Sequence, residues 1–286
     1  MTPAELLQHW LHRQLSAPTR QWIDSQCTLL AGTPRDRELN LAISLVSRKL
    51  GKEDLRLDAG DLEDARDARA DWDPRGWSID QAGRILLLLS ARISAEKFAQ
   101  WLDQLCQTAD VGELVAFYRG LPLYPDPPSH RLRAAEGVRS NMKAVFEAVA
   151  HRNPYPREEL PEGAWNQMVL KALFVGSALH PIQGLDERSN PTLMRMLCDY
   201  AHERWAATRP VSPELWRGVG RHADDAALAD LKRVMETGTT PERQAAALAL
   251  ADCPAPAARK LLESDAGLAR AVAGGTVTWE SIVQPS

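Results

Sequence analysis

The chain has 286 residues, 44% of them hydrophobic and 25% charged, with a formal net charge of −4. This length can bury a full core, and so small a net charge argues against a nucleic-acid or membrane-surface partner. No apolar run is long enough to span a bilayer. The cysteines stand far apart without metal-ligand spacing, which is typical of free thiols in a reducing compartment. We therefore expect a cytoplasmic protein without a transmembrane segment.

A Ser, Thr or Asn followed by proline recurs along the chain and predicts helix starts. The side-chain oxygen caps free N–H groups, and proline at the first helical position loses no hydrogen bond. The pattern occurs at Thr2, Thr33, Asn190, Ser212 and Thr240. Because strand-like alternation is nearly absent, we expect an all-α fold of many helices.

The first half of the chain offers successive amphipathic segments with apolar residues at helical spacing. We expect helices in the N-terminal 15 residues and over 18–30, 34–50, 78–92, 94–108 and 111–121. Residues 51–76 are instead rich in charge and predict a charged face with few core residues. Residues 122–129, PLYPDPPS, hold four prolines, which forbid an α-helix and mark a linker.

A long helix is expected over residues 131–152, and short alanine-rich helices follow the central part of the chain. Their lengths resemble HEAT-type repeats, in which neighbouring helices bury each other's faces. We therefore predict an α-solenoid, HEAT-like helical repeat architecture, although the sequence shows no rigorous period. One helical domain over 1–286 is expected, and a sub-division into 1–121 and 130–286 about the linker 122–129 is the alternative.

The polar residues that are hardest to explain as solvated surface lie between 153 and 217. We expect a nearly all-apolar helix over 165–179, a loop over 180–190 and an amphipathic helix over 191–208. Lys171, in the middle of the apolar helix, either reaches water or is held in low dielectric by a carboxylate or an anionic ligand. Asn166, near the start of that helix, would be hydrogen-bonded and orienting if it faces inward.

The loop sequence GLDERSN immediately precedes a predicted helix. Asn190 is expected to cap this helix, whose free N–H groups favour an anion. Arg188 beside the helix start and Arg195 one turn inside it suit a carboxylate or a phosphate. In the alternative interpretation, Asp186 pairs with Arg188 and only ties the loop.

Farther along the second helix, Arg195, Asp199, His202 and Glu203 fall at spacings of three and four, which predicts a polar ladder. Asp199-x-x-His202 is half of a di-metal helix signature, but no second copy stands out, so no metal is expected. The chain contains no P-loop, GxGxxG, HExxH or GxSxG motif. We therefore predict neither a catalytic residue nor a cofactor.

The run NPYPREELPEGAWNQMVLKALFVGSALHPIQGLDERSNPTLMRMLCDYAHERWAATRPVSPELWRGVG resembles the EboA family, helical proteins encoded in bacterial and algal ebo gene clusters. NQMVLKALF, GLDERSNP, DYAHERWAA and VSPELWR carry the resemblance, which looks specific over residues 153–220. The matching positions are Asn166, Lys171, Asp186, Arg188, Asn190, Asp199, His202, Glu203, Arg204 and Trp216.

The resemblance implies an all-helical cytoplasmic protein in a metabolite-traffic system whose gene clusters also encode a UbiA-type membrane prenyltransferase and hydrolase-like or isomerase-like enzymes. It carries over no catalytic residue. We predict a non-catalytic ligand-binding or adaptor component that contacts an ebo-pathway protein, such as the prenyltransferase, or an anionic or prenylated metabolite. The residues expected to bind the ligand are Asn166, Lys171, Asp186, Arg188, Asn190, Arg195, Asp199, His202, Glu203 and Arg204.

Two alternatives to this prediction stay open. In one, the protein is an enzyme acting on a prenylated or phosphorylated small molecule. Lys171 and the arginines would then bind the anion, and His202 would serve as general acid and base. In the other, all these charges only pair with one another inside the fold.

Overall fold

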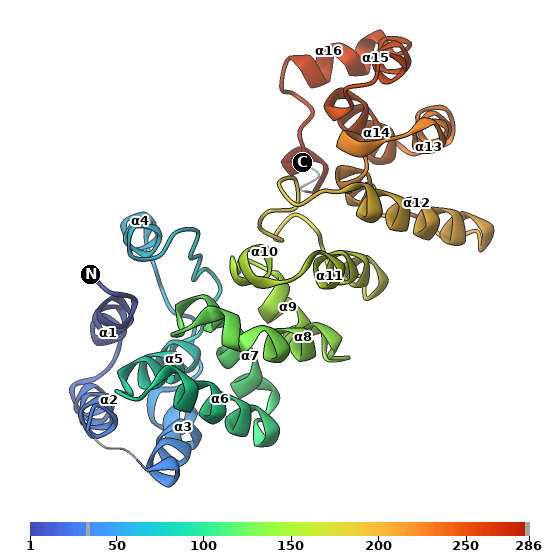
Figure 1. The fold of residues 1–286 in the computed structure, drawn as a ribbon. Coiled ribbons are helices and arrows are strands. Elements are labelled where there is room, and N and C mark those ends of the chain that lie inside the picture. Colours follow the sequence, from blue (N-terminus) through green and yellow to red (C-terminus); the bar gives the residue numbers. More distant parts are fainter. Residues whose placement is uncertain (33–34, 284–286) are drawn as a thin grey trace. The chain divides into compact units, whose positions relative to one another are not determined.

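The computed structural model describes residues 1–32 and 35–283, and these ranges contain helices but no strand (Figure 1). An isolated antiparallel bridge joins Asp54 and Ser78. The predicted all-α, multi-helix fold is therefore confirmed, whereas the HEAT-like arrangement stays a prediction. The helix start predicted at Thr33-Pro34 lies outside the described residues.

The chain divides into two compact units, Met1–Leu160 and Pro161–Ser286. The helices of the first unit are α1 (Pro3–Gln14), α2 (Ala17–Leu30), α3 (Asp36–Leu50), α4 (Ala59–Ala68), α5 (Ile79–Ser90), α6 (Ala95–Thr108), α7 (Val111–Arg119), η1 (Leu121–Leu123), η2 (Pro127–His130), α8 (Arg131–Arg139), α9 (Lys143–Ala150) and α10 (Tyr155–Glu159). Those of the second are α11 (Glu162–Phe174), α12 (Pro191–Ala206), η3 (Pro213–Gly218), η4 (Gly220–His222), α13 (Asp225–Thr237), α14 (Thr240–Asp252), α15 (Pro256–Glu263), α16 (Ala266–Ala273) and α17 (Trp279–Val283). Residues 122–129 lie inside the first unit, and the single-domain expectation stays a prediction.

Helix α5 forms the centre of the first unit because its sequence, IDQAGRILLLLS, is apolar on nearly every face. It packs against α1, α2, α3 and α7. Gly83 permits the close approach of α3, since a Cβ atom at this position would lie 2.5 Å from Leu50 Cδ2. The burial of its apolar side chains contributes to the hydrophobic stabilisation of the unit.

A charged pair lies inside this apolar centre. Arg84, only 2% exposed, donates from Nη1 to Asp80 Oδ2 at 2.5 Å and from Nη2 to Ser47 Oγ at 2.6 Å. Ser78 Oγ donates to the other Asp80 oxygen at 2.5 Å. The hydrogen bonds offset the cost of removing both charges from water.

The predicted helix over 131–152 is wrong in one respect, because it is broken into α8 and α9. At the break, the Ser140 hydroxyl accepts a hydrogen bond from the Met142 N–H at 3.1 Å. Serine side chains compete in this way with the helical backbone bonds. The hydrophobic spacing continues across the break, so the periodicity alone did not reveal it.

The charged segment 51–76 also contributes more to the core than its composition indicates. It contains α4 and the buried side chains of Leu55, Trp72 and Asp61. Asp61 accepts a short hydrogen bond from Arg13 Nη2 of α1. A carboxylate of this charged segment therefore lies in the interior, paired with an arginine that is distant in sequence.

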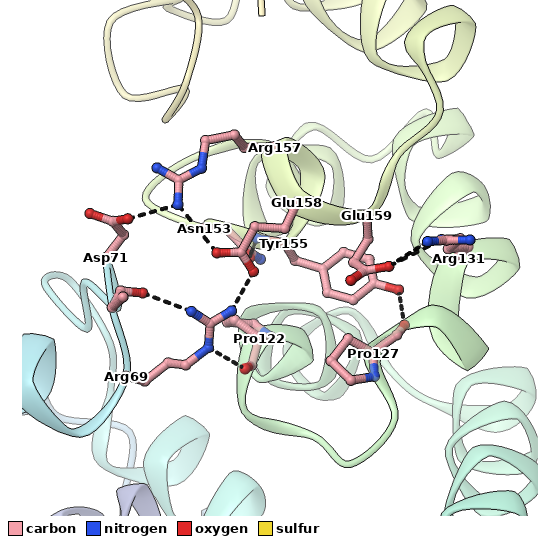
Figure 2. A network of polar contacts seen from close by, with 11 residues as sticks. Arg69, Asp71, Pro122, Pro127, Arg131, Asn153, Tyr155, Arg157, Glu158 and Glu159 are labelled. Carbon is pink, nitrogen blue, oxygen red and sulfur yellow. Dashed lines mark hydrogen bonds and ion pairs between the residues drawn. The ribbon is translucent and has the colours of Figure 1, made fainter. Parts of the chain in front are cut away.

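Helix α10 lies just after the start of the EboA-like run at Asn153, and polar contacts tie this part of the run to the rest of the first unit (Figure 2). Asn153 Nδ2 donates to the carbonyls of Tyr118 and Ala148, both at 3.0 Å, and Tyr155 Oη donates to the Pro127 carbonyl at 2.6 Å. Glu158 forms ion pairs with Arg69 and Arg157. Arg157 also pairs with Asp71, and Glu159 pairs with Arg131. These bonds hold α10 against α9 and the turn η2, so this part of the run has a structural role.

The second unit is built around α14, TPERQAAALALAD, whose small side chains let neighbours pack on several faces. It contacts α13, α15, α16, α17, η3 and η4. A Cβ atom on Gly220 would lie 2.3 Å from the Ala249 carbonyl oxygen, so glycine is required where η4 meets α14. Helix α12 packs against α11, α13 and η3 at the other side of this core.

Candidate functional site

Helices α11 and α12 are joined by a reciprocal pair of amides. Asn166 Nδ2 donates to Asn190 Oδ1 at 3.1 Å, and Asn190 Nδ2 donates to Asn166 Oδ1 at 2.9 Å. Asn190 Oδ1 also accepts from the Leu193 N–H at 2.9 Å, which confirms its predicted capping of α12. Asn166 is 2% exposed and faces inward.

The predicted 165–179 helix ends earlier, at Phe174, because Gly176 adopts a left-handed φ of +64°. The Ser177 N–H then donates back to the Ala172 carbonyl at 2.7 Å, which closes the helix end. The chain that follows is fixed by Glu214. Its carboxylate accepts from the N–H groups of Leu179 and His180 at 3.0 and 2.6 Å.

The predicted helix start at Ser212-Pro213 gives the 3₁₀ helix η3 rather than an α-helix. Its Arg217 forms a two-pronged ion pair with Asp186, Nε to Oδ1 at 2.7 Å and Nη2 to Oδ2 at 2.6 Å. Asp186 therefore ties the loop to η3. Its carboxylate pairs with Arg217, whereas the alternative interpretation expected it to pair with Arg188. The hydrogen bonds to Asp186 raise the pKa of Arg217, so this guanidinium keeps its charge.

A small cavity of about 150 Å³ lies beside this ion pair. It is lined by Asp186, Arg217, Arg221, Ala249, Asp252 and Trp279. Arg221 Nη1 donates to the Asp186 carbonyl at 3.1 Å, and the Arg217 guanidinium carbon lies 5.9 Å from the centre of the Trp279 ring. The cavity is therefore lined by two guanidinium groups, two carboxylates and one aromatic ring.

Lys171 and Arg188 are both half-buried. The guanidinium carbon of Arg188 lies 4.9 Å from the ring centre of Trp165, a buried residue of α11. Desolvation lowers the pKa of Lys171 and of Arg188 below their ordinary values. The structure therefore keeps both cations in partly dehydrated surroundings, where charge interactions are stronger than on open surface.

The polar ladder predicted along α12 does not form in the described part of the chain. Arg195, Asp199 and Glu203 are exposed, and no ion pair joins them to one another or to His202. His202 Nε2 instead lies 2.7 Å from Asp230 Oδ1 on α13. Because α12 and α13 pack together, Asp230 on α13 lies within hydrogen-bond distance of His202.

Arg204, the last of the residues expected to bind, donates from Nε to the Pro210 carbonyl at 3.0 Å and holds the chain after α12. Residues 1–32 and 35–283 contain no group of three His, Cys, Asp or Glu side chains placed to hold a metal ion. Over the same residues, no helix combines the length and the apolar character needed to cross a membrane.

The structure adds functional candidates that the sequence interpretation did not single out. They are Glu214, Arg217, Arg221, Asp230 and Trp165, each of which contacts a predicted residue or its loop. Glu214 and Arg217 do fall within the segment VSPELWR, so their position in the EboA-like run was the one available signal. Asp230 and Arg221 lie beyond that run.

The chain was compared with known proteins at the level of family, sequence and structure. The family model described as "Metabolite traffic protein EboA" matches residues 3–220. No curated protein and no solved structure matches the chain. The family match covers the first unit from residue 3 onward and the second unit up to residue 220, including the loop with the Asp186–Arg217 pair. Since it spans well over half of the sequence, the chain belongs to the EboA family of metabolite traffic proteins.

Proposed function

We propose that this protein is a non-catalytic binding component of a cytoplasmic metabolite-traffic system. The loop 175–190 and the flanking helices α11 and α12 would contact the anionic part of a metabolite, prenylated or not, or an acidic group of a partner protein. The observation that carries the proposal is the surrounding of Lys171 and Arg188. Both cations have pKa values lowered by desolvation, and the Asn166–Asn190 amide pair joins the helices on either side of their loop.

Rigid positioning matters because a binding surface that is already ordered loses less conformational entropy when its ligand arrives. The loop is fixed at its start by Glu214 and at its end by Asn190. His222 Nε2 lies 2.9 Å from the Ser189 carbonyl and adds a further tie. These contacts support a preformed site for recognition.

An enzymatic role is the second candidate, and the His202–Asp230 pair is the observation that favours it. A histidine oriented by a carboxylate is the arrangement that general acid–base catalysis uses. The His202 side chain, however, is 53% exposed. Exclusion of water strengthens the electrostatic interactions that catalysis uses, so this exposure favours the binding role.

Titration calorimetry tests the binding proposal directly. Polyprenyl phosphates and aromatic prenyl compounds are titrated into the wild type and into Lys171→Met, with Lys49→Met on α3 as the matched control. We expect one of the compounds to bind, Lys171→Met to weaken it about tenfold or more, and Lys49→Met to leave it unchanged. Equal affinities in all three proteins, with helicity preserved, would move the site elsewhere.

The adaptor form of the proposal needs a separate experiment. The chain is co-expressed with each protein encoded in its gene cluster, including the UbiA-type prenyltransferase if present, and purified by an affinity tag. Stable co-purification that is lost in Lys171→Met would support a protein partner at this surface. Absence of every partner, together with absence of ligand binding, would contradict both forms of the proposal.

A third measurement separates binding from catalysis. Any compound that binds is incubated with the wild type and with His202→Gln, and its consumption is followed by mass spectrometry. The proposal predicts an unchanged compound in both samples. Turnover by the wild type that disappears in His202→Gln would establish the enzymatic alternative.

A further inference from the structure

The cavity beside Asp186 contains guanidinium groups with hydrogen-bonding capacity left over. Arg217 uses Nε and Nη2 for the Asp186 carboxylate, and within the described residues its Nη1 has no hydrogen-bond acceptor. Arg221 uses Nη1 for the Asp186 carbonyl. Its Nε lies 3.6 Å from Asp252 Oδ2, beyond hydrogen-bond distance. Both arginines line the same cavity.

The ion pair between Arg221 and Asp252 is longer and more exposed than the ion pair between Arg217 and Asp186. Each side chain is 49% exposed, whereas the Arg217 side chain is 19% exposed and bound to Asp186 at 2.6 Å. An exposed pair at such a distance contributes about 1 kcal/mol or less. A competing anion can therefore displace Asp252 from Arg221 at little cost, while the Asp186–Arg217 pair stays intact.

The size of the cavity limits what it can hold. At about 30 Å³ per water molecule, its 150 Å³ would take about five waters. This space is enough for a single phosphate or carboxylate group, and the charged side chains that line it favour an oxyanion over an apolar group. Guanidinium groups recognise such oxyanions through planar, paired N–H donors.

The C-terminal segment completes this cavity. Helix α17 contacts α14 and η3, and the centre of its Trp279 ring lies 5.9 Å from the guanidinium carbon of Arg217. Ala249, Asp252 and Trp279 lie beyond the residues that the family model matches, whereas Asp186 and Arg217 lie within them. The subsite is thus assembled from the EboA-like loop and from the helices that follow it.

From these observations we propose that Arg217 and Arg221 form a subsite for a phosphate group, which replaces Asp252 at Arg221 and bridges to Nη1 of Arg217. The group is either free phosphate or the head group of a larger metabolite. In the second case the subsite rests on the proposed function and identifies where the anionic end of the ligand binds. Trp279 forms the wall of the subsite beside Arg217.

The experiment uses the full chain and titrates inorganic phosphate, pyrophosphate and a polyprenyl phosphate by calorimetry. Arg221→Gln removes the loosely paired cation and should weaken binding about tenfold or more, the value of a charge-assisted hydrogen bond. Asp252→Asn removes the competing carboxylate and should strengthen binding about two- to fivefold. Arg259→Gln, on the exposed Arg259–Glu263 pair of α15, is the matched control and should change nothing.

Circular dichroism and thermal unfolding check that each variant keeps its fold. Opposite shifts in Arg221→Gln and Asp252→Asn establish the subsite, and binding of inorganic phosphate without binding of the polyprenyl phosphate identifies free phosphate as its ligand. Unchanged affinity in both variants, or no phosphate binding by the wild type, overturns it. If a polyprenyl phosphate binds and depends on Lys171 but not on Arg221, the proposed function stands and the subsite is rejected. If inorganic phosphate binds through Arg221 while every metabolite fails, the subsite stands and the proposed function does not.

Discussion

Asn166 and Asn190, 24 positions apart in the chain, exchange two amide hydrogen bonds of 3.1 and 2.9 Å. The same Asn190 oxygen accepts the Leu193 N–H and caps α12. One side chain therefore starts a helix and joins it to its neighbour. Capping α12 and pairing with Asn166 contribute separately to the free energy of unfolding, and mutation can distinguish the two contributions.

Replacing Asn190 with alanine removes the cap and leaves the buried Asn166 amide without its partner. We expect a loss of roughly 2–4 kcal/mol in the free energy of unfolding, the sum of a cap and an unsatisfied amide. Urea denaturation followed by circular dichroism measures it. Asp224→Ala is the control, because Asp224 only caps α13, through the Ala227 N–H at 2.9 Å. It should cost about 1 kcal/mol. Equal losses in the two variants would show that the amide pair adds nothing.

Two glycines at opposite ends of α11 provide a matched pair of alanine substitutions. Gly176 has a φ of +64°, Gly163 lies in the helix, and an added Cβ atom would meet no atom within 4 Å at either position. Gly176→Ala should therefore destabilise by about 1–2 kcal/mol through backbone strain alone. Gly163→Ala should stabilise by about 0.5–1 kcal/mol. Thermal and urea unfolding test the two signs, and a destabilising Gly163→Ala would contradict this account.

The predictable features of the fold were the local ones. Asn190 caps α12 as expected, because a cap, its proline and the next N–H groups are neighbours in the chain. Thr2 likewise accepts the Glu5 N–H at the start of α1. The break between α8 and α9 is also local. It could not be predicted because the helical spacing of the apolar residues continues across Ser140.

The partners of the candidate site could not be predicted in the same way. Asp186 has Arg188 nearby in sequence, and yet its carboxylate binds Arg217, 31 positions away. His202 has carboxylates on its own helix and meets Asp230 on the next one. Which of several charges pairs with a given residue depends on how the helices pack, and sequence spacing carries no information about that packing. The ligand-binding role of these residues stays a prediction.

The buried Asp80–Arg84 pair predicts strong coupling between two positions. Arg84→Met would leave the Asp80 carboxylate buried without its cation and should cost about 3–5 kcal/mol. Adding Asp80→Asn should recover part of that loss because it removes the buried carboxylate, although Glu113, whose Oε1 lies 3.8 Å from Arg84 Nη2, still loses its cation. A double-mutant cycle from urea unfolding measures the coupling. Arg259→Met, at a surface pair with exposed side chains, should cost about 0.5 kcal/mol or less. Strictly additive losses at the buried pair would contradict the prediction.

His130 predicts how the stability of the first unit depends on pH. The side chain is 1% exposed, between the rings of Phe98 and Tyr124, and its Nε2 donates to the Pro125 carbonyl at 3.0 Å. Burial lowers the pKa of His130 below its ordinary 6.5, although the nearby carboxylates of Asp126 and Asp103 act in the opposite direction. The folded protein therefore holds this histidine neutral over a range where the unfolded chain already protonates it.

Because the unfolded state binds more protons in this range, the contribution of His130 is fully present above pH 6.5 and is lost as the pH falls toward the lowered pKa. We expect the free energy of unfolding to decrease over that interval more steeply in the wild type than in His130→Gln. Urea denaturation at a series of pH values gives both curves, and their difference isolates His130 from the other histidines. His9→Gln, at an exposed position of α1, should follow the wild type. Parallel curves for the wild type and His130→Gln would mean that burial of this ring does not oppose its protonation.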